Sequence, residues 1–195
     1  MKIPELTFFT ELPAGELQAL FEDKSIIEHL QSLEASLSLG ILDLTDERAE
    51  IVRKLNQGGI PLTAWLLLPE DEGYWFNLDN HEQAAARYVA FKAWTTHHDL
   101  EWEGVGLDIE VNINELRSIL EEREAGNFIK KLWHRYLDKP RVVQAQRAYQ
   151  ALVDLIRADG YRVESYHIPL ISEERRAKST VLQRTAGLVD LETDR

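Results

Sequence analysis

The stretch Trp102-Glu103-Gly104-Val105-Gly106-Leu107-Asp108-Ile109-Glu110 determines how the rest of the chain is interpreted. It predicts a buried β-strand, because successive side chains of a strand point to opposite faces and these residues divide into two unlike sets. One face is apolar and carries Val105, Leu107 and Ile109. The other face has two glycines, which leave space, followed by the carboxylates of Asp108 and Glu110. These two acids are therefore the first candidates for function.

The composition is that of an ordinary soluble globular protein. The chain has 195 residues, of which 44% are hydrophobic and 29% charged, so it can bury a sizeable core as a single domain spanning residues 1–195. The formal net charge of -12 argues against a nucleic acid as partner, because phosphate contacts require clustered Lys and Arg. The absence of cysteine excludes disulfides, thiolate nucleophiles and Cys-type zinc sites.

Neither a secretion signal nor a membrane span is evident in the sequence. The start, Met1–Glu5, lacks a basic region followed by an apolar run. The longest apolar run, Ala64–Leu68, is far too short to cross a bilayer. We therefore expect a cytoplasmic protein that has no membrane partner.

Short apolar runs alternate with longer amphipathic runs along the chain, which is typical of a protein built from strand–helix units. The apolar runs predict strands at Leu6–Thr10, Leu37–Leu42, Ile60–Leu68, Trp102–Glu110 and Tyr161–Ile168. The amphipathic runs predict helices at Glu16–Leu33, Asp46–Asn56, His81–His97, Asn114–Asp159 and Glu173–Val189, the fourth broken at Gly126-Asn127 and Lys139-Pro140. Thr45 and Asn80 precede two of these helices and are predicted to cap them.

Five strand–helix units in series predict an α/β fold with a parallel sheet and right-handed crossovers. A (β/α)8 barrel of the TIM type fits the regular alternation better than a doubly wound sheet, because no Gly-rich phosphate turn follows the first strand. Eight units need roughly 250 residues, so we expect a truncated barrel with about the first five units. The missing C-terminal half of the barrel, or a second copy in a homo-oligomer, would then cover the exposed edge of the fifth strand.

The two carboxylates suit acid–base chemistry. Asp108 and Glu110 lie two residues apart on one strand, so their side chains share a face and are roughly 7 Å apart along it. In a barrel, Glu110 would lie at the mouth and Asp108 one layer below, with Gly106 leaving space for the Asp108 side chain. A carboxylate held near a second one raises the pKa of the second, which suits a general acid at neutral pH. The alternative is that both acids are ordinary ion-pair partners of Lys or Arg.

The same stretch resembles a motif of the family 18 chitinases and their relatives. Those proteins carry Asp-Gly-x-Asp-x-Asp-x-Glu on the fourth strand of a (β/α)8 barrel, and this chain has Glu103-Gly104-Val105-Gly106-Leu107-Asp108-Ile109-Glu110 in the same frame. The first acid of the motif is replaced by Glu103 and the second by Gly106. The resemblance implies that Glu110 donates a proton to the glycosidic oxygen. It also implies that Asp108 orients an N-acetyl group of the substrate during substrate-assisted attack.

Other residues near predicted strand ends are candidates for substrate binding. Tyr74 and Trp75 lie in the loop after the third strand, and flat aromatic faces near a barrel mouth stack well on sugar rings. The alternative is that these aromatic residues pack the loop onto its own helix. Asp43 ends the second strand, and Glu164 and Tyr166 share one face of the fifth. We expect no cofactor and no metal in the favoured interpretation.

The favoured function is hydrolysis or binding of a carbohydrate, or of another small polar substrate, with Glu110 as general acid/base assisted by Asp108. One rival is a metal-dependent barrel enzyme, of the sugar isomerase or hydrolase type, in which Asp43, Glu110 and Glu164 hold a divalent ion. The other rival is a non-catalytic carbohydrate-binding or scaffold barrel. The absence of an acid at Gly106 favours this last alternative.

Overall fold

The structure is a computed structural model that describes residues 6–110, 139–166, 176–177, 179, 189 and 191–194. Parts of the sequence-based prediction lie outside these residues. They are the helical region up to residue 138 with its break at Gly126-Asn127, the end of the fifth strand at Ile168, and nearly all of the helix expected at Glu173–Val189.

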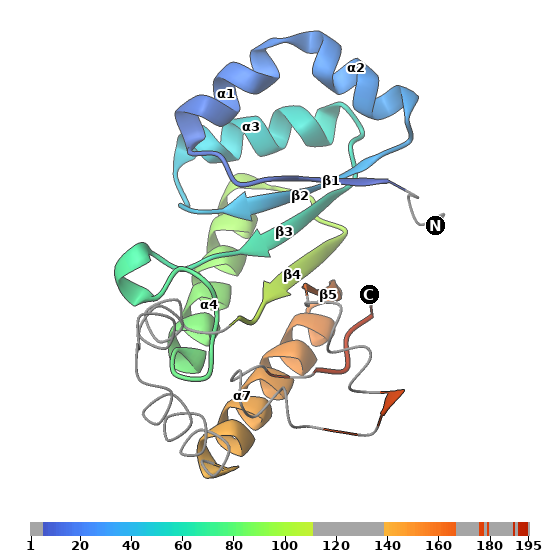
Figure 1. The fold of residues 1–195 in the computed structure, drawn as a ribbon. Coiled ribbons are helices and arrows are strands. Elements are labelled where there is room, and N and C mark those ends of the chain that lie inside the picture. The colour runs from blue at the N-terminus through green and yellow to red at the C-terminus, as the bar shows by residue number, and fades with distance from the viewer. Residues whose placement is uncertain are drawn as a thin grey trace, which may run out of the picture.

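Five parallel strands form one sheet, and they follow one another in space in the same order as in the sequence (Figure 1). The strands are β1 (Thr7–Thr10), β2 (Ser36–Ile41), β3 (Leu62–Leu66), β4 (Gly104–Asp108) and β5 (Arg162–Tyr166). Each predicted strand is therefore present, with ends that differ from the predicted ends by at most two residues. The α/β fold with a parallel sheet of strand–helix repeats is confirmed.

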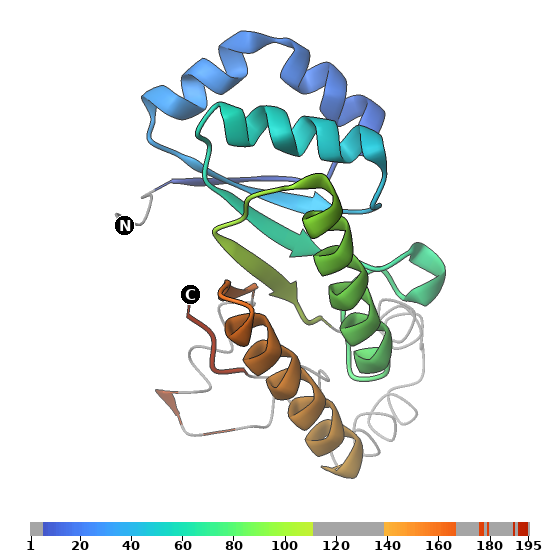
Figure 2. The same cartoon turned by 180° about the vertical axis from the view of Figure 1, so that it is seen from behind.

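Helices cover the outer face of this sheet. They are α1 (Ala14–Glu22), α2 (Lys24–Ser32), α3 (Asp46–Gln57), α4 (His81–His98) and α7 (Lys139–Ala158), and a short 3-10 helix, η1 (Glu70–Glu72), follows β3. Seen from behind, α3, α4 and α7 lie in front of the strands, whereas the opposite view shows the inner face of the sheet (Figures 1 and 2). Within the described part of the chain, no helix has the length and apolar character needed to span a bilayer.

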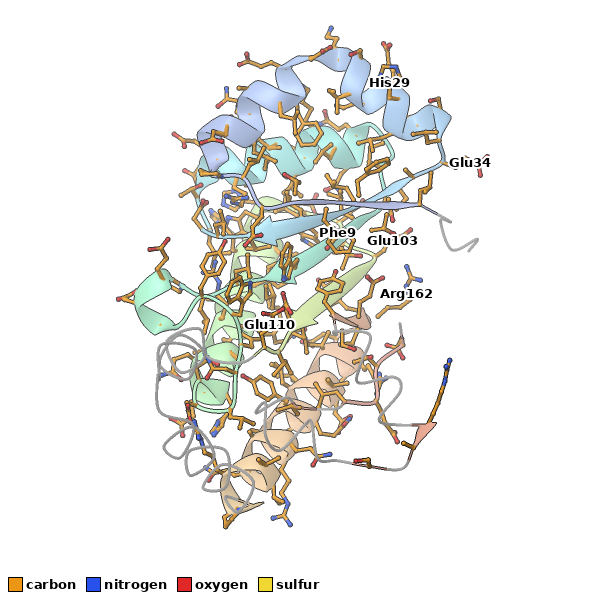
Figure 3. The ribbon with its side chains drawn as sticks, in the orientation of Figure 1. Phe9, His29, Glu34, Glu103, Glu110 and Arg162 are labelled. Carbon is orange, nitrogen blue, oxygen red and sulfur yellow. The ribbon has the colours of Figure 1, made fainter. Side chains whose placement is uncertain are left out.

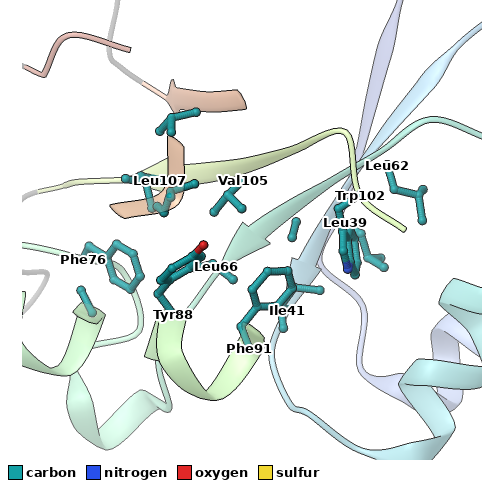
Figure 4. Packing of buried hydrophobic residues seen from close by; sticks show 14 of the residues in the cluster. Leu39, Ile41, Leu62, Leu66, Phe76, Tyr88, Phe91, Trp102, Val105 and Leu107 are labelled. Atoms are coloured by element: carbon teal, nitrogen blue, oxygen red, sulfur yellow. The ribbon is translucent and has the colours of Figure 1, made fainter. Parts of the chain in front are cut away.

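The hydrophobic core lies between the sheet and these helices. The outward side chains of the central strands are almost completely buried, and they pack against two aromatic residues of α4, Tyr88 and Phe91 (Figure 4). These strand residues are Leu39, Ile41, Leu66, Val105 and Leu107. Removing this much apolar surface from water is the main stabilising contribution to the fold.

The predicted helix Glu16–Leu33 is in fact two helices that meet at Asp23. This residue has an extended backbone conformation, with φ of -74° and ψ of 104°, which ends α1. Its carboxylate accepts a hydrogen bond from the backbone N–H of Ser25 at 2.9 Å and so caps α2. The apolar spacing runs through both helices, and for this reason the periodicity alone did not reveal the break.

The two predicted helix caps have different outcomes. The Thr45 hydroxyl accepts a hydrogen bond from the backbone N–H of Arg48 at 3.3 Å, so the predicted cap of α3 is confirmed. Asn80 occupies the position before α4, but its side chain makes no hydrogen bond to that helix, so the predicted side-chain cap is wrong. The Asn80 side-chain amide instead forms hydrogen bonds with backbone groups of the loop that precedes the helix.

The two edges of the sheet differ. At β5, the backbone N–H of Asp194 donates to the carbonyl of Val163 at 2.8 Å, and the Asp194 carboxylate accepts from the N–H of Val163 at 2.8 Å. The segment at residues 191–194 therefore occupies part of this edge, which was expected to be exposed. At β1, no described strand pairs with the edge opposite β2.

Candidate functional site

Three aromatic rings meet on the inner face of the sheet. They come from alternate strands and are Phe9 of β1, Trp65 of β3 and Tyr166 of β5. Their centroids are 5.2 Å apart for Phe9 and Tyr166, 5.8 Å for Trp65 and Tyr166, and 6.2 Å for Phe9 and Trp65, all in edge-to-face geometry. The Tyr166 hydroxyl also hydrogen-bonds the Ser38 hydroxyl of β2 at 2.7 Å. The sheet is therefore curved enough for side chains of its two edge strands to touch.

Tyr166 explains the glycine at position 106. A Cβ atom added to Gly106 would lie 2.5 Å from the Tyr166 hydroxyl oxygen and 2.7 to 2.8 Å from ring carbons, which is closer than real contacts allow. The interpretation that Gly106 leaves space for the Asp108 side chain is therefore corrected, because Tyr166 fills that space. The substrate-binding role predicted for Tyr166 remains a prediction, although the residue lies on the inner face as expected.

Asp108 and Glu110 lie at the carboxyl end of β4. The loop after β3 holds this end, because the N–H of Phe76 donates to the carbonyl of Asp108 at 3.1 Å and the N–H of Glu110 donates to the carbonyl of Phe76 at 2.8 Å. Figure 3 shows Glu110 at the end toward which the strands run. Asp108 is only 6% exposed, whereas Glu110 is half-buried. Glu110 is therefore the more accessible of the two acids.

The pKa of each carboxyl group is raised above its ordinary value. Burial raises the pKa of Asp108 to about 7, and the negative charges of Glu110 and Glu11 add to this effect. Burial also raises the pKa of Glu110 above its ordinary value. The larger shift lies on Asp108 because it is the more buried. No described residue donates a hydrogen bond to either carboxylate or forms an ion pair with it. The alternative that both acids are ordinary ion-pair partners of Lys or Arg therefore finds no support among the described residues.

Glu11 is a third acid at this end of the sheet. It directly follows the last residue of β1, and its backbone passes close to β2, where a Cβ on Gly40 would lie 3.2 Å from the Glu11 Cα. The Tyr74 hydroxyl donates a hydrogen bond to the Glu11 carboxylate. Burial, together with this bond to Glu11, raises the pKa of the Tyr74 hydroxyl. Tyr74, predicted to bind substrate, therefore lies beside the acids.

Hydrogen bonds hold the loop that carries Tyr74 in one shape. The Asn80 amide oxygen accepts from the N–H of Asn77 at 2.7 Å, and the amide nitrogen donates to the carbonyls of Glu72 at 3.1 Å and Trp75 at 2.9 Å. The Tyr149 hydroxyl of α7 lies 2.7 Å from the Asn77 carbonyl. Trp75 contacts Tyr74 edge-to-face at 5.3 Å and remains half-buried.

Asp43 and Glu164 are the remaining predicted site residues. Asp43 accepts hydrogen bonds from the Thr45 hydroxyl at 2.6 Å and from Arg48 at 2.9 Å, and these bonds outweigh partial burial and lower its pKa. Arg48 is itself fully buried and also donates to the carbonyls of Gly40 and Leu12. Glu164 is buried on the inner face, where it pairs in register with Gly106, two residues before Tyr166 on β5.

The opposite end of β4 carries the residue that replaces the first acid of the chitinase motif. Glu103 forms an ion pair with Arg162 of β5 at 2.8 Å (Figure 3). Glu103 is thus about the length of β4 away from Glu110. Its ion pair links β4 to β5 at the amino end of the two strands. Among the described residues, no group of three or more His, Cys, Asp or Glu side chains is placed to hold a metal ion.

Comparison with protein-family models, with curated proteins and with solved structures gives no match for this chain. The residues of the site must therefore be interpreted from their own geometry. Sequence reasoning named Asp108, Glu110, Tyr74 and Trp75. It missed the supporting roles of Asn80 and Tyr149, for which the sequence carries no local signal.

Proposed function

We propose that the protein is a glycoside hydrolase-like protein in which Glu110 acts as general acid/base and Asp108 assists it. The observation that carries the proposal is the pair of acids at the carboxyl end of β4, both with raised pKa values and without described cationic partners. A carboxyl group with a raised pKa holds its proton to a higher pH than an ordinary one, which suits the protonation of a leaving oxygen. The ends of parallel strands are also where strand–helix repeat enzymes hold their catalytic residues.

The roles follow from accessibility. Glu110 is half-buried and can reach a bound substrate, so it protonates the glycosidic oxygen. Asp108 is nearly inaccessible to solvent and lies two residues earlier on the same face. Its carboxyl group either orients the substrate, as the chitinase resemblance implies, or modulates the proton affinity of Glu110. Tyr74 and Trp75 offer aromatic faces for a sugar ring, and Asp43, Glu164 and Tyr166 belong to the same proposal as further binding residues.

The proposal includes a (β/α)8 barrel as the complete architecture. In such barrels, each interior layer takes its side chains from alternate strands. Phe9, Trp65 and Tyr166 come from β1, β3 and β5 and contact one another, which supports this arrangement. Either a C-terminal barrel half or a second copy would complete it. A cytoplasmic location and a carbohydrate as substrate remain part of the proposal.

Turnover of an activated aryl glycoside tests the acid role. We expect Glu110→Gln to abolish hydrolysis while leaving the midpoint of thermal unfolding nearly unchanged, because the amide keeps the shape but cannot donate a carboxyl proton. Glu103→Gln is the matched control, since it removes a carboxylate from the opposite end of the same strand. Unchanged turnover in the Glu110 variant would rule out the proposed role.

A non-catalytic carbohydrate-binding protein is the second candidate. The observation in its favour is that Tyr166 fills the space beside Gly106, where the chitinase motif has an acid. This candidate predicts that the protein binds oligosaccharides and shows no Glu110-dependent turnover. Any hydrolysis that Glu110→Gln removes would refute it.

A further inference from the structure

We propose that the site at the carboxyl end of β1 and β4 binds a protonated amine, so that its ligand is a sugar bearing a free ammonium group. That the ligand is a sugar rests on the proposed function. That the ligand carries a positive charge rests on the residues of the site. The acids of the site are Glu11, Asp108 and Glu110, and they come from two strands that are not neighbours in the sheet.

The surroundings of Asp108 indicate that the site binds a cationic ligand. More than nine-tenths of its surface is buried, its side chain lies on the inner face with the other acids, and no described residue donates to it. A buried carboxyl group without a partner is costly, because burial removes water without replacing its hydrogen bonds. A ligand that brings N–H donors and positive charge would supply what the described residues do not.

Two arginines of α3 and α4 are committed elsewhere. Arg48 binds Asp43 and the carbonyls of Gly40 and Leu12, and Arg87 donates to the carbonyl of Ile41 at 2.8 Å. Neither contributes to the charge environment of Asp108, whose charged neighbours in the described chain are Glu110 and Glu11. The described part of the protein therefore supplies no positive charge to Asp108, and a cationic ligand would favour its ionised form.

The aromatic residues of the site suit the same ligand. Tyr166 pairs in register with Asp108, and Trp65 pairs with Gly106, so the three-ring cluster lies directly beside the acids on the inner face. Tyr74 adds a fourth aromatic residue, and its hydroxyl donates a hydrogen bond to Glu11. Aromatic faces attract ammonium groups through cation–π interactions, and they also stack on sugar rings. The net charge of -12 would further draw a cationic ligand toward the protein.

Isothermal titration calorimetry of the whole chain tests the inference. The probes are a tetrasaccharide of glucosamine, its fully N-acetylated form and cellotetraose, at a mildly acidic pH where the sugar amine is protonated. We expect the glucosamine oligomer to bind at least about tenfold more tightly than the two neutral oligomers. Added salt should weaken this preference, because it screens charge. Binding should also release protons as Asp108 ionises, measured in buffers of different ionisation enthalpy.

Three variants locate the effect. Asp108→Asn and Glu11→Gln should each remove the preference for the glucosamine oligomer, whereas Glu103→Gln should retain it. Thermal unfolding of each variant shows that it is folded. Equal binding of the three oligomers, or a preference that survives Asp108→Asn, would overturn the inference.

The inference and the proposed function fail separately. Hydrolysis of neutral sugars without any preference for the amine would leave Glu110 catalytic and overturn the amine site. Amine-dependent binding without turnover would establish the amine site and contradict the hydrolase.

Discussion

Asp108 is held where its surroundings oppose ionisation. Its side chain is buried at the end of β4, and two further acids, Glu110 and Glu11, act on it from its own strand and from the end of β1. Its pKa is therefore about 7 in the folded protein, against 3.8 for an ordinary Asp. A group that binds its proton more tightly in the folded state than in the unfolded state makes stability depend on pH.

The sign of this dependence gives the first prediction. Between about pH 4 and pH 7 the folded protein keeps the Asp108 proton that the unfolded chain has lost, so the contribution of Asp108 to stability falls as pH rises. We expect Asp108→Asn to raise the free energy of unfolding at pH values above about 7, by up to on the order of 4 kcal/mol, and to have little effect near pH 4. Urea denaturation at several pH values measures the difference.

Asp43 is the matched control for this measurement, because its pKa is shifted in the opposite direction. Its stabilising contribution is present above the pKa of the unfolded state and is lost as pH falls through the lower pKa of the folded state. Asp43→Asn should therefore lower stability at neutral pH. A pH profile of Asp108→Asn parallel to that of the unsubstituted protein would contradict the first prediction.

At the scale of elements, the loop between β3 and α4 links the site to α7. Asn80 is buried and makes hydrogen bonds to Asn77, Glu72 and Trp75, while Tyr149 of α7 reaches the Asn77 carbonyl. This network satisfies backbone groups that would otherwise be buried without partners. The loop keeps its shape through contacts with a helix about 70 residues later in the chain.

This network gives the second prediction. We expect Asn80→Ala to lower the free energy of unfolding by about 2–3 kcal/mol, because it leaves the buried N–H of Asn77 without a partner and removes the amide donor from the carbonyls of Glu72 and Trp75. Tyr149→Phe should cost about 1–2 kcal/mol, since one buried hydroxyl is lost. The Tyr149 hydroxyl lies 3.1 Å from the Asn80 amide oxygen, so the double variant should be less destabilised than the sum of the two. Strict additivity in chemical denaturation would show that the two residues act independently.

At the scale of the whole molecule, the β1 edge is apolar and pairs with no further strand among the described residues. Of the eight large hydrophobic side chains that are exposed in the described residues, five lie here, namely Leu6, Phe8, Phe9, Leu20 and Leu33. Four of them line an apolar groove of about 300 Å³ between β1 and the first two helices. An unpaired strand beside an apolar surface promotes association between chains. By contrast, part of the β5 edge is covered, because Asp194 forms hydrogen bonds with the backbone N–H and carbonyl of Val163.

The third prediction follows from this asymmetry. We expect Phe8→Lys combined with Leu33→Lys to reduce both the binding of a hydrophobic fluorescent dye and the light scattering of concentrated solutions. The stability of the variant should remain within about 1 kcal/mol of the original, because both side chains are already about half exposed. Val89→Lys is the control, since it changes an exposed residue of α4 far from the groove lining. An equal reduction by Val89→Lys would show that charge alone is responsible.

The sequence by itself determined the five strands, their order and the positions of α3 and α4. Alternation of side chains along β4 and the apolar runs of the other strands are local properties, and so Asp108 and Glu110 could be placed on one face before any contact was known. Parallel pairing followed, because a helix between successive strands returns the chain to the same end of the sheet. The break at Asp23 escaped this reasoning, because a short cap does not interrupt the apolar spacing.

Only the tertiary structure decided which residues meet. The curvature of the sheet brings Tyr166 over Gly106, and places Glu11 near Asp108 although about 100 residues separate them in the chain. Such contacts depend on the total twist that accumulates over several strands of the sheet. A local sequence pattern does not predict this total twist. The raised pKa of Asp108 depends on burial and on charges from another strand, and therefore only the folded molecule determines it.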